Sequence, residues 1–115
     1  MAAKKIAVTF FATETGTERV RAWLKSLDKA DRSKIGESVR TVEFGWPIGM
    51  PVCKPLGRGL YGVRVSLKDR IARVLFGIEG SEMILLHGLI KKSQTTPKPD
   101  LDLARTRLKE FKRHQ

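Results

Sequence analysis

The sequence predicts an α+β fold in which helices pack on part of a twisted sheet. Two periodicities carry this prediction. Apolar residues recur every three or four positions between residues 18 and 44 and again after residue 100, which is typical of amphipathic helices. Between residues 60 and 90 they alternate with polar residues, which is typical of strands. The predicted order is an N-terminal strand, a two-helix hairpin, a three-stranded antiparallel meander and a C-terminal helix.

The N-terminal strand is predicted at residues 6–11, IAVTFF, where β-branched and aromatic residues are concentrated. A helix should follow, because Thr15 and Glu18 have the S/T-x-x-E spacing of a capping box. Its apolar stripe consists of Val20, Trp23, Leu24 and Leu27.

A second helix is predicted to begin at Lys29 or Asp31 and to end before the breaker at residues 45–47. Its apolar side consists of Ile35, Val39 and Val42. We expect Trp23 and Trp46 to be core side chains, with a role as base-stacking platforms as the alternative.

Two strands, at residues 60–67 and 71–79, form a predicted hairpin with a two-residue turn at Lys68 and Asp69. This register pairs Leu67 with Arg70, Val65 with Ala72, and Arg64 with Arg73. It also brings the apolar faces of the two strands together, which supports it independently. Like charges directly opposite each other destabilise a sheet. A fold that keeps both arginines is therefore expected to bind an anion between them.

A tight turn at Gly80 and Ser81 leads to a third predicted strand at residues 83–90. With this turn Val74 pairs with His87, which places His87 on the face opposite the two arginines. A one-residue bulge would reverse that placement. His87 is therefore either a structural, hydrogen-bonded histidine or a site residue.

The last predicted element is a helix that follows the polar, proline-containing segment at residues 91–99. Asp100 can serve as its N-cap or as an acid in its first turn. Its apolar stripe consists of Leu101, Ala104, Leu108 and Phe111. The basic residues on its other faces are either solvated or an extension of an anion-binding surface.

The 115 residues carry 23 Lys and Arg against 12 Asp and Glu, a formal net charge of +11. Residues 51–75 carry 6 basic against 1 acidic side chain, and residues 87–115 carry 8 against 3. A domain this basic usually meets nucleic acid, acidic lipid or an acidic protein. The alternative is that the positive charge only keeps the protein soluble. No apolar run approaches the roughly 20 residues of a membrane span, so no membrane partner is expected.

We expect one domain over residues 1–115 and a cytoplasmic location. The N-terminus has the pattern of a strand and not of a signal peptide. A single cysteine, Cys53, excludes an internal disulfide and a multi-cysteine zinc site. We expect Cys53 to be a small hydrophobic side chain, with a catalytic thiol as the alternative.

Several strings in the second half of the chain resemble the RelE/HigB-type toxins of bacterial and phage toxin–antitoxin modules, with the closest match to their phage-derived, HigB-like branch. They are the KPL-x-x-GLY-x-VR entry into the meander, the RVLF strand and the LLHGLIKKSQTTP exit. The specific part covers residues 51–99 and is extended by the DLDLARTRLKEF helix. The resemblance implies a RelE-like fold whose concave sheet surface binds RNA.

The resemblance also implies an mRNA interferase, a cofactor-free endoribonuclease that cuts messenger RNA in the ribosomal A site. A cognate antitoxin, expected to be a helix-turn-helix protein, would hold it inactive. The catalytic candidates by position are Lys54, Arg64, Arg73, His87, Lys91 and Lys92. The basic candidates for RNA binding are Arg58, Lys68, Arg70 and Lys98. Relatives usually carry Glu where this chain has Gly62, which removes a possible partner of Arg64 or a proton acceptor.

Metal-free RNA cleavage needs a base, a stabilised phosphorane and an acid for the leaving oxygen. Asp69 stands alone in the basic region, which disfavours a magnesium site. The guanidinium groups of Arg64 and Arg73 suit phosphate oxygens. The proton-transfer roles stay open between Lys54, Lys91, Lys92 and His87. The alternative function is a non-catalytic or degenerate RNA- or DNA-binding module that mainly binds an acidic antitoxin.

Overall fold

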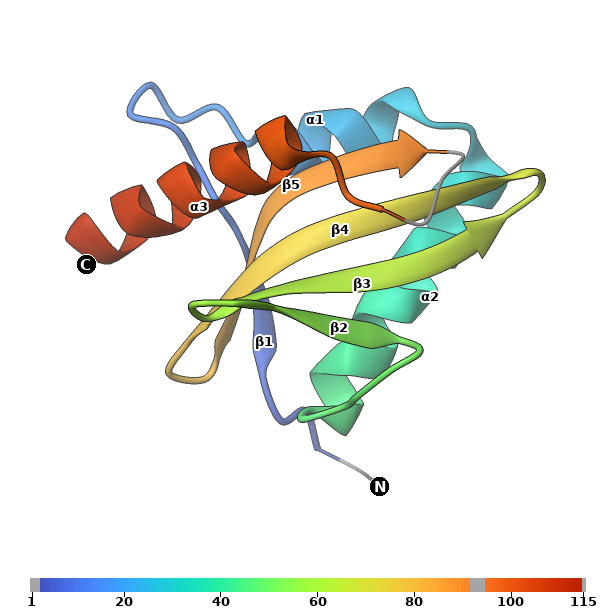
Figure 1. The fold of residues 1–115 in the computed structure, drawn as a ribbon, viewed down its shortest axis with the longest axis horizontal. Helices are drawn as coiled ribbons and strands as arrows, with labels where there is room; N and C mark the ends of the chain where they lie inside the picture. Colours follow the sequence, from blue (N-terminus) through green and yellow to red (C-terminus); the bar gives the residue numbers. More distant parts are fainter. Residues whose placement is uncertain (1–2, 92–94, 115) are drawn as a thin grey trace.

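A computed structural model describes residues 3–91 and 95–114. In these residues, a five-stranded mixed sheet carries three helices distributed over its two faces (Figure 1). The elements are β1 (Ala7–Phe10), α1 (Arg19–Ser26), α2 (Lys29–Gly45), β2 (Cys53–Gly57), β3 (Leu60–Leu67), β4 (Arg70–Glu79), β5 (Glu82–Lys91) and α3 (Lys98–Arg113). No helix in the described ranges is long and apolar enough to cross a membrane.

The strands lie in the order β1-β5-β4-β3-β2. β1 is parallel to β5, whereas the other neighbouring strands are antiparallel. The α+β class and the β3–β4–β5 meander are therefore confirmed.

The edge strand β2 corrects the predicted three-stranded meander. Pro55 lies inside it and has no amide hydrogen to donate, so this segment does not resemble a strand in sequence. Proline is tolerated here because β2 pairs with β3 on one side only. The pairing also shifts between Pro55 and Gly57.

Each face of the sheet contributes to a separate apolar core. The face covered by α1 and α2 includes Val63, Val65, Leu67, Ala72, Val74 and Phe76, as the alternation predicts. On the other face, Leu60, Leu75, Ile84 and Leu86 pack with Ala104 and Leu108 of α3. The face that the sequence assigns to polar side chains is therefore open only beyond the area that α3 covers (Figure 1).

The start of α1 differs from the prediction. Glu18 is the N-cap residue but makes no side-chain capping bond, and its carboxylate pairs with Arg21 instead. The Thr17 amide donates to Oγ1 of Thr13 in a separate turn. The capping-box prediction for Thr15 and Glu18 is therefore wrong.

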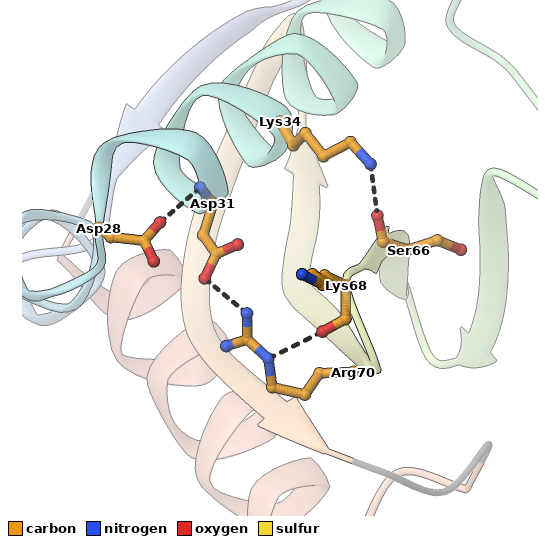
Figure 2. Close-up of polar contacts among 6 residues, drawn as sticks. All are labelled: Asp28, Asp31, Lys34, Ser66, Lys68 and Arg70. Atoms are coloured by element: carbon orange, nitrogen blue, oxygen red, sulfur yellow. Dashed lines mark hydrogen bonds and ion pairs between the residues drawn. The ribbon is translucent and has the colours of Figure 1, made fainter.

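The first turns of α2 hold the end of the β3–β4 hairpin (Figure 2). Asp28 caps the helix by accepting from the Asp31 amide at 2.9 Å. The Asp31 carboxylate accepts from Arg70 at 2.9 Å, and Lys34 Nζ donates to the Ser66 carbonyl at 3.2 Å. These contacts fix the tip of the hairpin against α2.

Two arginines fasten α3 across the sheet. Arg105 donates to the carbonyls of Leu56 and Gly57 in β2, at 2.7 and 3.0 Å. Arg107 donates to the Leu86 carbonyl in β5 at 2.7 Å. These basic residues therefore make defined tertiary contacts and are not simply a solvated helix face.

Candidate functional site

The centre of the site is the pair formed by Arg64 on β3 and Arg73 on β4. The predicted register is confirmed, because the two residues are direct cross-strand partners. The turn at Lys68 and Asp69 that sets this register has Asp69 in the left-handed region, at φ 61°. Hairpin geometry therefore places two like charges opposite each other.

The environment of the pair is unusual for two arginines. Arg73 is only 3% exposed. Nε of Arg64 and Nε of Arg73 are both buried and have no hydrogen-bond partner among the described residues. Burial, and secondarily the charge of Arg64, lowers the pKa of Arg73. A buried donor without a partner costs free energy, so an anionic ligand would be stabilised here.

Two lysines extend the cluster on the same face of the sheet. Lys54 of β2 is exposed and lies opposite Gly62 of β3. Lys91 at the end of β5 lies opposite Ile71 of β4, and its Nζ donates to Thr96 Oγ1 at 3.3 Å. Lys92, the other predicted lysine, lies outside the described residues.

The positive charges of the cluster change the pKa of Lys91. Burial and the positive charges of Arg73, Lys54 and Arg64 lower its pKa to about 8, with Asp100 acting in the opposite direction. About a tenth of Lys91 side chains are therefore neutral at pH 7, compared with less than a thousandth at the ordinary value. An amine of this kind can accept a proton near neutral pH.

The cluster carries excess positive charge. Among the described residues, no carboxylate forms an ion pair with Lys54, Arg64 or Arg73. Several acids elsewhere in the described residues pair with cations outside these three, as in the contact between Asp31 and Arg70. A multivalent anion such as a phosphodiester would relieve this repulsion.

His87 lies on the arginine face, which corrects the placement by simple parity. The β4–β5 pairing shifts between Leu75 and Phe76, so that Leu75 is opposite His87 and Phe76 is opposite Leu85. Leu86 is thus the extra residue of a bulge. His87 Nε2 lies 2.6 Å from Oδ1 of Asp100 in the first turn of α3. An ionised carboxylate only accepts hydrogen bonds, so Nε2 is the donor and Nδ1 remains for other contacts.

The four predicted RNA-binding residues are dispersed. Arg70 faces α2 and pairs with Asp31 (Figure 2). Lys68 is exposed in the β3–β4 turn and Arg58 in the β2–β3 turn, which lie at opposite ends of β3. Lys98 begins α3 and pairs with Asp102 at 3.1 Å. Arg70 is therefore excluded from the cluster by geometry.

Gly62 leaves room for the Arg73 side chain. A Cβ atom at position 62 would lie 3.3 Å from Cδ of Arg73 and 3.3 Å from Cδ2 of Leu75. The aliphatic part of Arg73 therefore lies over Gly62, and a larger residue there would move the guanidinium group.

A well-defined cavity lies away from the cluster. Its volume is about 770 Å³, and it is lined by Phe10, Phe11, Ala12, Thr13, Glu14, Glu82, Glu110, Phe111 and His114. An open sheet face can bind an extended polymer without such a cavity. Cys53 belongs to the apolar core under α1 and α2, and its burial raises its pKa to about 11, which disfavours a thiolate.

The comparison with protein families identifies relatives of this chain. Residues 22–109 match the family described as Phage derived protein Gp49-like (DUF891). The chain belongs to this family. The Gp49-like family is of the RelE/HigB toxin type, which places the chain in a toxin–antitoxin context. No curated protein matches the chain.

The matched residues of this Gp49-like protein include the cationic cluster and most of the helix that carries Asp100. Sequence reasoning identifies Asp100 only as a helix-start residue and misses its contact with His87. The available signal is the position of Asp100 in the first turn of a helix that directly follows the β5 exit loop.

Proposed function

We propose that this Gp49-like protein is the toxin of a type II toxin–antitoxin system and cuts messenger RNA on the ribosome. The observation that supports the proposal is the like-charged pair of buried Arg73 and half-buried Arg64, whose buried Nε atoms have no hydrogen-bond partner among the described residues. Planar guanidinium groups match phosphate oxygens, and their charge is most valuable when the pentavalent phosphorane forms. In this proposal the pair holds the scissile phosphate.

Lys91 is proposed as the general base. Its neutral amine removes the proton from the 2′-hydroxyl, and the resulting 2′-oxygen attacks phosphorus. The bond from phosphorus to the 5′-oxygen then breaks, which gives a 2′,3′-cyclic phosphate and a 5′-hydroxyl. The pKa of about 8, caused by burial and neighbouring cations, supports this role because it makes a neutral amine accessible.

His87 is proposed as the general acid that protonates the leaving 5′-oxygen. Asp100 accepts from Nε2 and would hold the imidazolium in place while Nδ1 gives up the proton. Lys54 adds positive charge beside the phosphate. All proton transfers in this scheme are made by side chains of the chain itself.

The proposed partners follow from this role. A cognate antitoxin, which we infer to be a helix-turn-helix protein, would block the cationic cluster with an acidic segment. The substrate complex would be a ribosome with bound messenger RNA, which requires a cytoplasmic location.

The test is to add purified protein to translating ribosomes and map the 5′ ends of a defined message by primer extension. We expect new 5′ ends at codon positions on the ribosome-bound message and few on the same message alone. The Arg64→Ala/Arg73→Ala double variant serves as the inactive control. New ends of equal intensity with that variant would contradict the site, and absence of new ends with the wild-type protein would contradict the function.

The toxicity of a Gly62→Glu variant distinguishes the hypothesis of an active toxin from the alternative of a degenerate module. If the cluster is complete as it stands, the added carboxylate pairs with Arg73 and competes with phosphate. We then expect a gain of about 1 kcal/mol in unfolding free energy and a loss of toxicity in a growth assay. Gly62→Ala is the matched control, because it adds the Cβ without the charge. Increased toxicity of Gly62→Glu would instead favour the degenerate module.

A further inference from the structure

The outer edge of β5 is only partly paired. β1 accompanies β5 as far as the pair Phe10 and Leu85, and the Phe11 amide then donates to the Leu85 carbonyl at 3.1 Å. In the described part of the chain no strand continues along this edge beyond that point. There α1 and α3 lie close to β5 on its two sides (Figure 1).

A small recess occupies this position. Its volume is about 210 Å³, and it is lined by Arg19, Val20, Trp23, His87, Gly88 and Arg107. A Cβ at Gly88 would lie 2.3 Å from the Trp23 ring, so glycine is needed for the indole to pack against β5. The recess is smaller than the roughly 300 Å³ at which pockets for whole small molecules begin. Its size suits a single group of a larger ligand.

Two arginines from different helices give the recess its charge. Arg19 is exposed at the start of α1, and no hydrogen bond or ion pair involves its side chain among the described residues. Arg107 donates through one nitrogen to the Leu86 carbonyl. Burial and then the charge of Arg19 lower the pKa of Arg107, while Glu110 opposes the shift. The two guanidinium groups are therefore close enough to repel each other.

His87 connects this recess with the cationic cluster. It lines the recess and bonds to Asp100, and it also lies on the same sheet face as Arg73. A polymer held at the cluster would meet the recess directly beyond His87. Repeating negative charges along such a polymer match two separate cationic positions.

We propose that the recess between Arg19 and Arg107 is a second phosphate subsite, which binds a phosphodiester of single-stranded RNA next to the one held by Arg64 and Arg73. This inference rests on the proposed function, since it takes the cluster as the position of the scissile phosphate. The RNA strand would cross the open edge of β5, with His87 between the two phosphates. Binding at the recess would position the strand and take no part in proton transfer.

The test measures binding of a 2′-O-methyl oligoribonucleotide, which has no free 2′-hydroxyl and so cannot be cleaved. Affinity is determined for wild-type, Arg19→Gln and Arg21→Gln proteins over a series of salt concentrations. Loss of one phosphate contact should reduce the slope of log K against log salt by about 0.7 and weaken binding about fivefold at 0.1 M salt. We expect this change for Arg19→Gln.

Arg21→Gln is the matched control, because it removes the same charge from the same helix. Arg21 pairs with Glu18 and lies 4.4 Å from the centre of the Phe10 ring, away from the recess. It should keep the wild-type slope. Equal effects of the two variants, an unchanged slope for Arg19→Gln, or no binding by the wild-type protein would each overturn the subsite. Because the oligonucleotide is not cleaved, these results are independent of the cleavage test on ribosomes.

Discussion

An Arg73→Met variant should be more stable than the wild-type protein and yet lose messenger-RNA cleavage by at least about 100-fold. Arg73 is buried opposite Arg64, and its Nε has no partner among the described residues. Methionine keeps the apolar part of the side chain and removes a buried charge, which should add about 1–2 kcal/mol to the unfolding free energy. For a domain of this size that corresponds to a rise of about 4–8 °C or more in melting temperature.

The control for this variant is Arg70→Met on the same strand. Arg70 pairs with Asp31 on the opposite face, so its removal leaves a largely buried carboxylate without its partner. It should therefore lower the melting temperature and leave cleavage unchanged. A structural role for Arg73 predicts the reverse of our expectation, namely that Arg73→Met is destabilised and still active. Thermal unfolding and primer extension on the same preparations distinguish the two results.

Lys91→Arg should reduce the cleavage rate by about 100-fold to 10,000-fold, the usual contribution of a general base. Arginine preserves the positive charge that binds phosphate but does not release its proton near neutral pH. The affinity of this variant for an uncleavable RNA should therefore change little, whereas its cleavage rate should fall strongly. If the rate of Lys91→Arg stays near the wild-type value, Lys91 acts only through its charge.

The pH dependence gives an independent measure of the same role. In the proposed mechanism the neutral amine is the active form, and its fraction increases as pH rises through the pKa of Lys91, which is about 8. The wild-type cleavage rate should therefore rise about tenfold per pH unit at low pH, and it should fall again at high pH, where His87 loses the proton that it donates. Lys91→Arg should abolish this rise. Because Arg73 helps to lower the pKa of Lys91, the rising part of the pH profile should lie at higher pH for the residual activity of Arg73→Met.

The pairing of the two arginines could be predicted because a two-residue turn leaves little freedom of register. Once Lys68 and Asp69 form the turn, every later pair in the hairpin follows, and the alternation of apolar residues provides a check. Helix positions are predictable for a similar reason, since their apolar stripes are long. The start of α1 could not be predicted in this way, because three threonines before Glu18 form a turn of their own.

The sheet face on which His87 lies depends on one extra residue in β5, so the alternation of side chains could not predict it. The bulge lies in the continuous apolar run of residues 83–86, where alternation does not mark a face. Both cores accept leucine, so either register is compatible with the sequence there. A local shift of this kind exchanges the faces of all later side chains of β5, which brings His87, Leu89 and Lys91 to the arginine face.

The sequence does indicate that part of the arginine face is covered, but the alternation of apolar and polar residues alone does not reveal this. Leu60 shares the face of Arg64, which requires apolar cover over part of that face. Only the tertiary position of α3 shows where the cover ends. Similarly, β2 gains strand geometry from its pairing with β3 and not from its own composition.

If the opposed arginines bind phosphate as proposed, they should also bind small multivalent anions. Sulfate or phosphate in a buffer can bridge the two guanidinium groups, whereas chloride at the same ionic strength mainly screens them. Two solutions of equal ionic strength would then leave different fractions of the protein available to its substrate. Inhibition of this kind raises the apparent KM and leaves kcat unchanged, so the buffer anion determines the affinity that an assay reports.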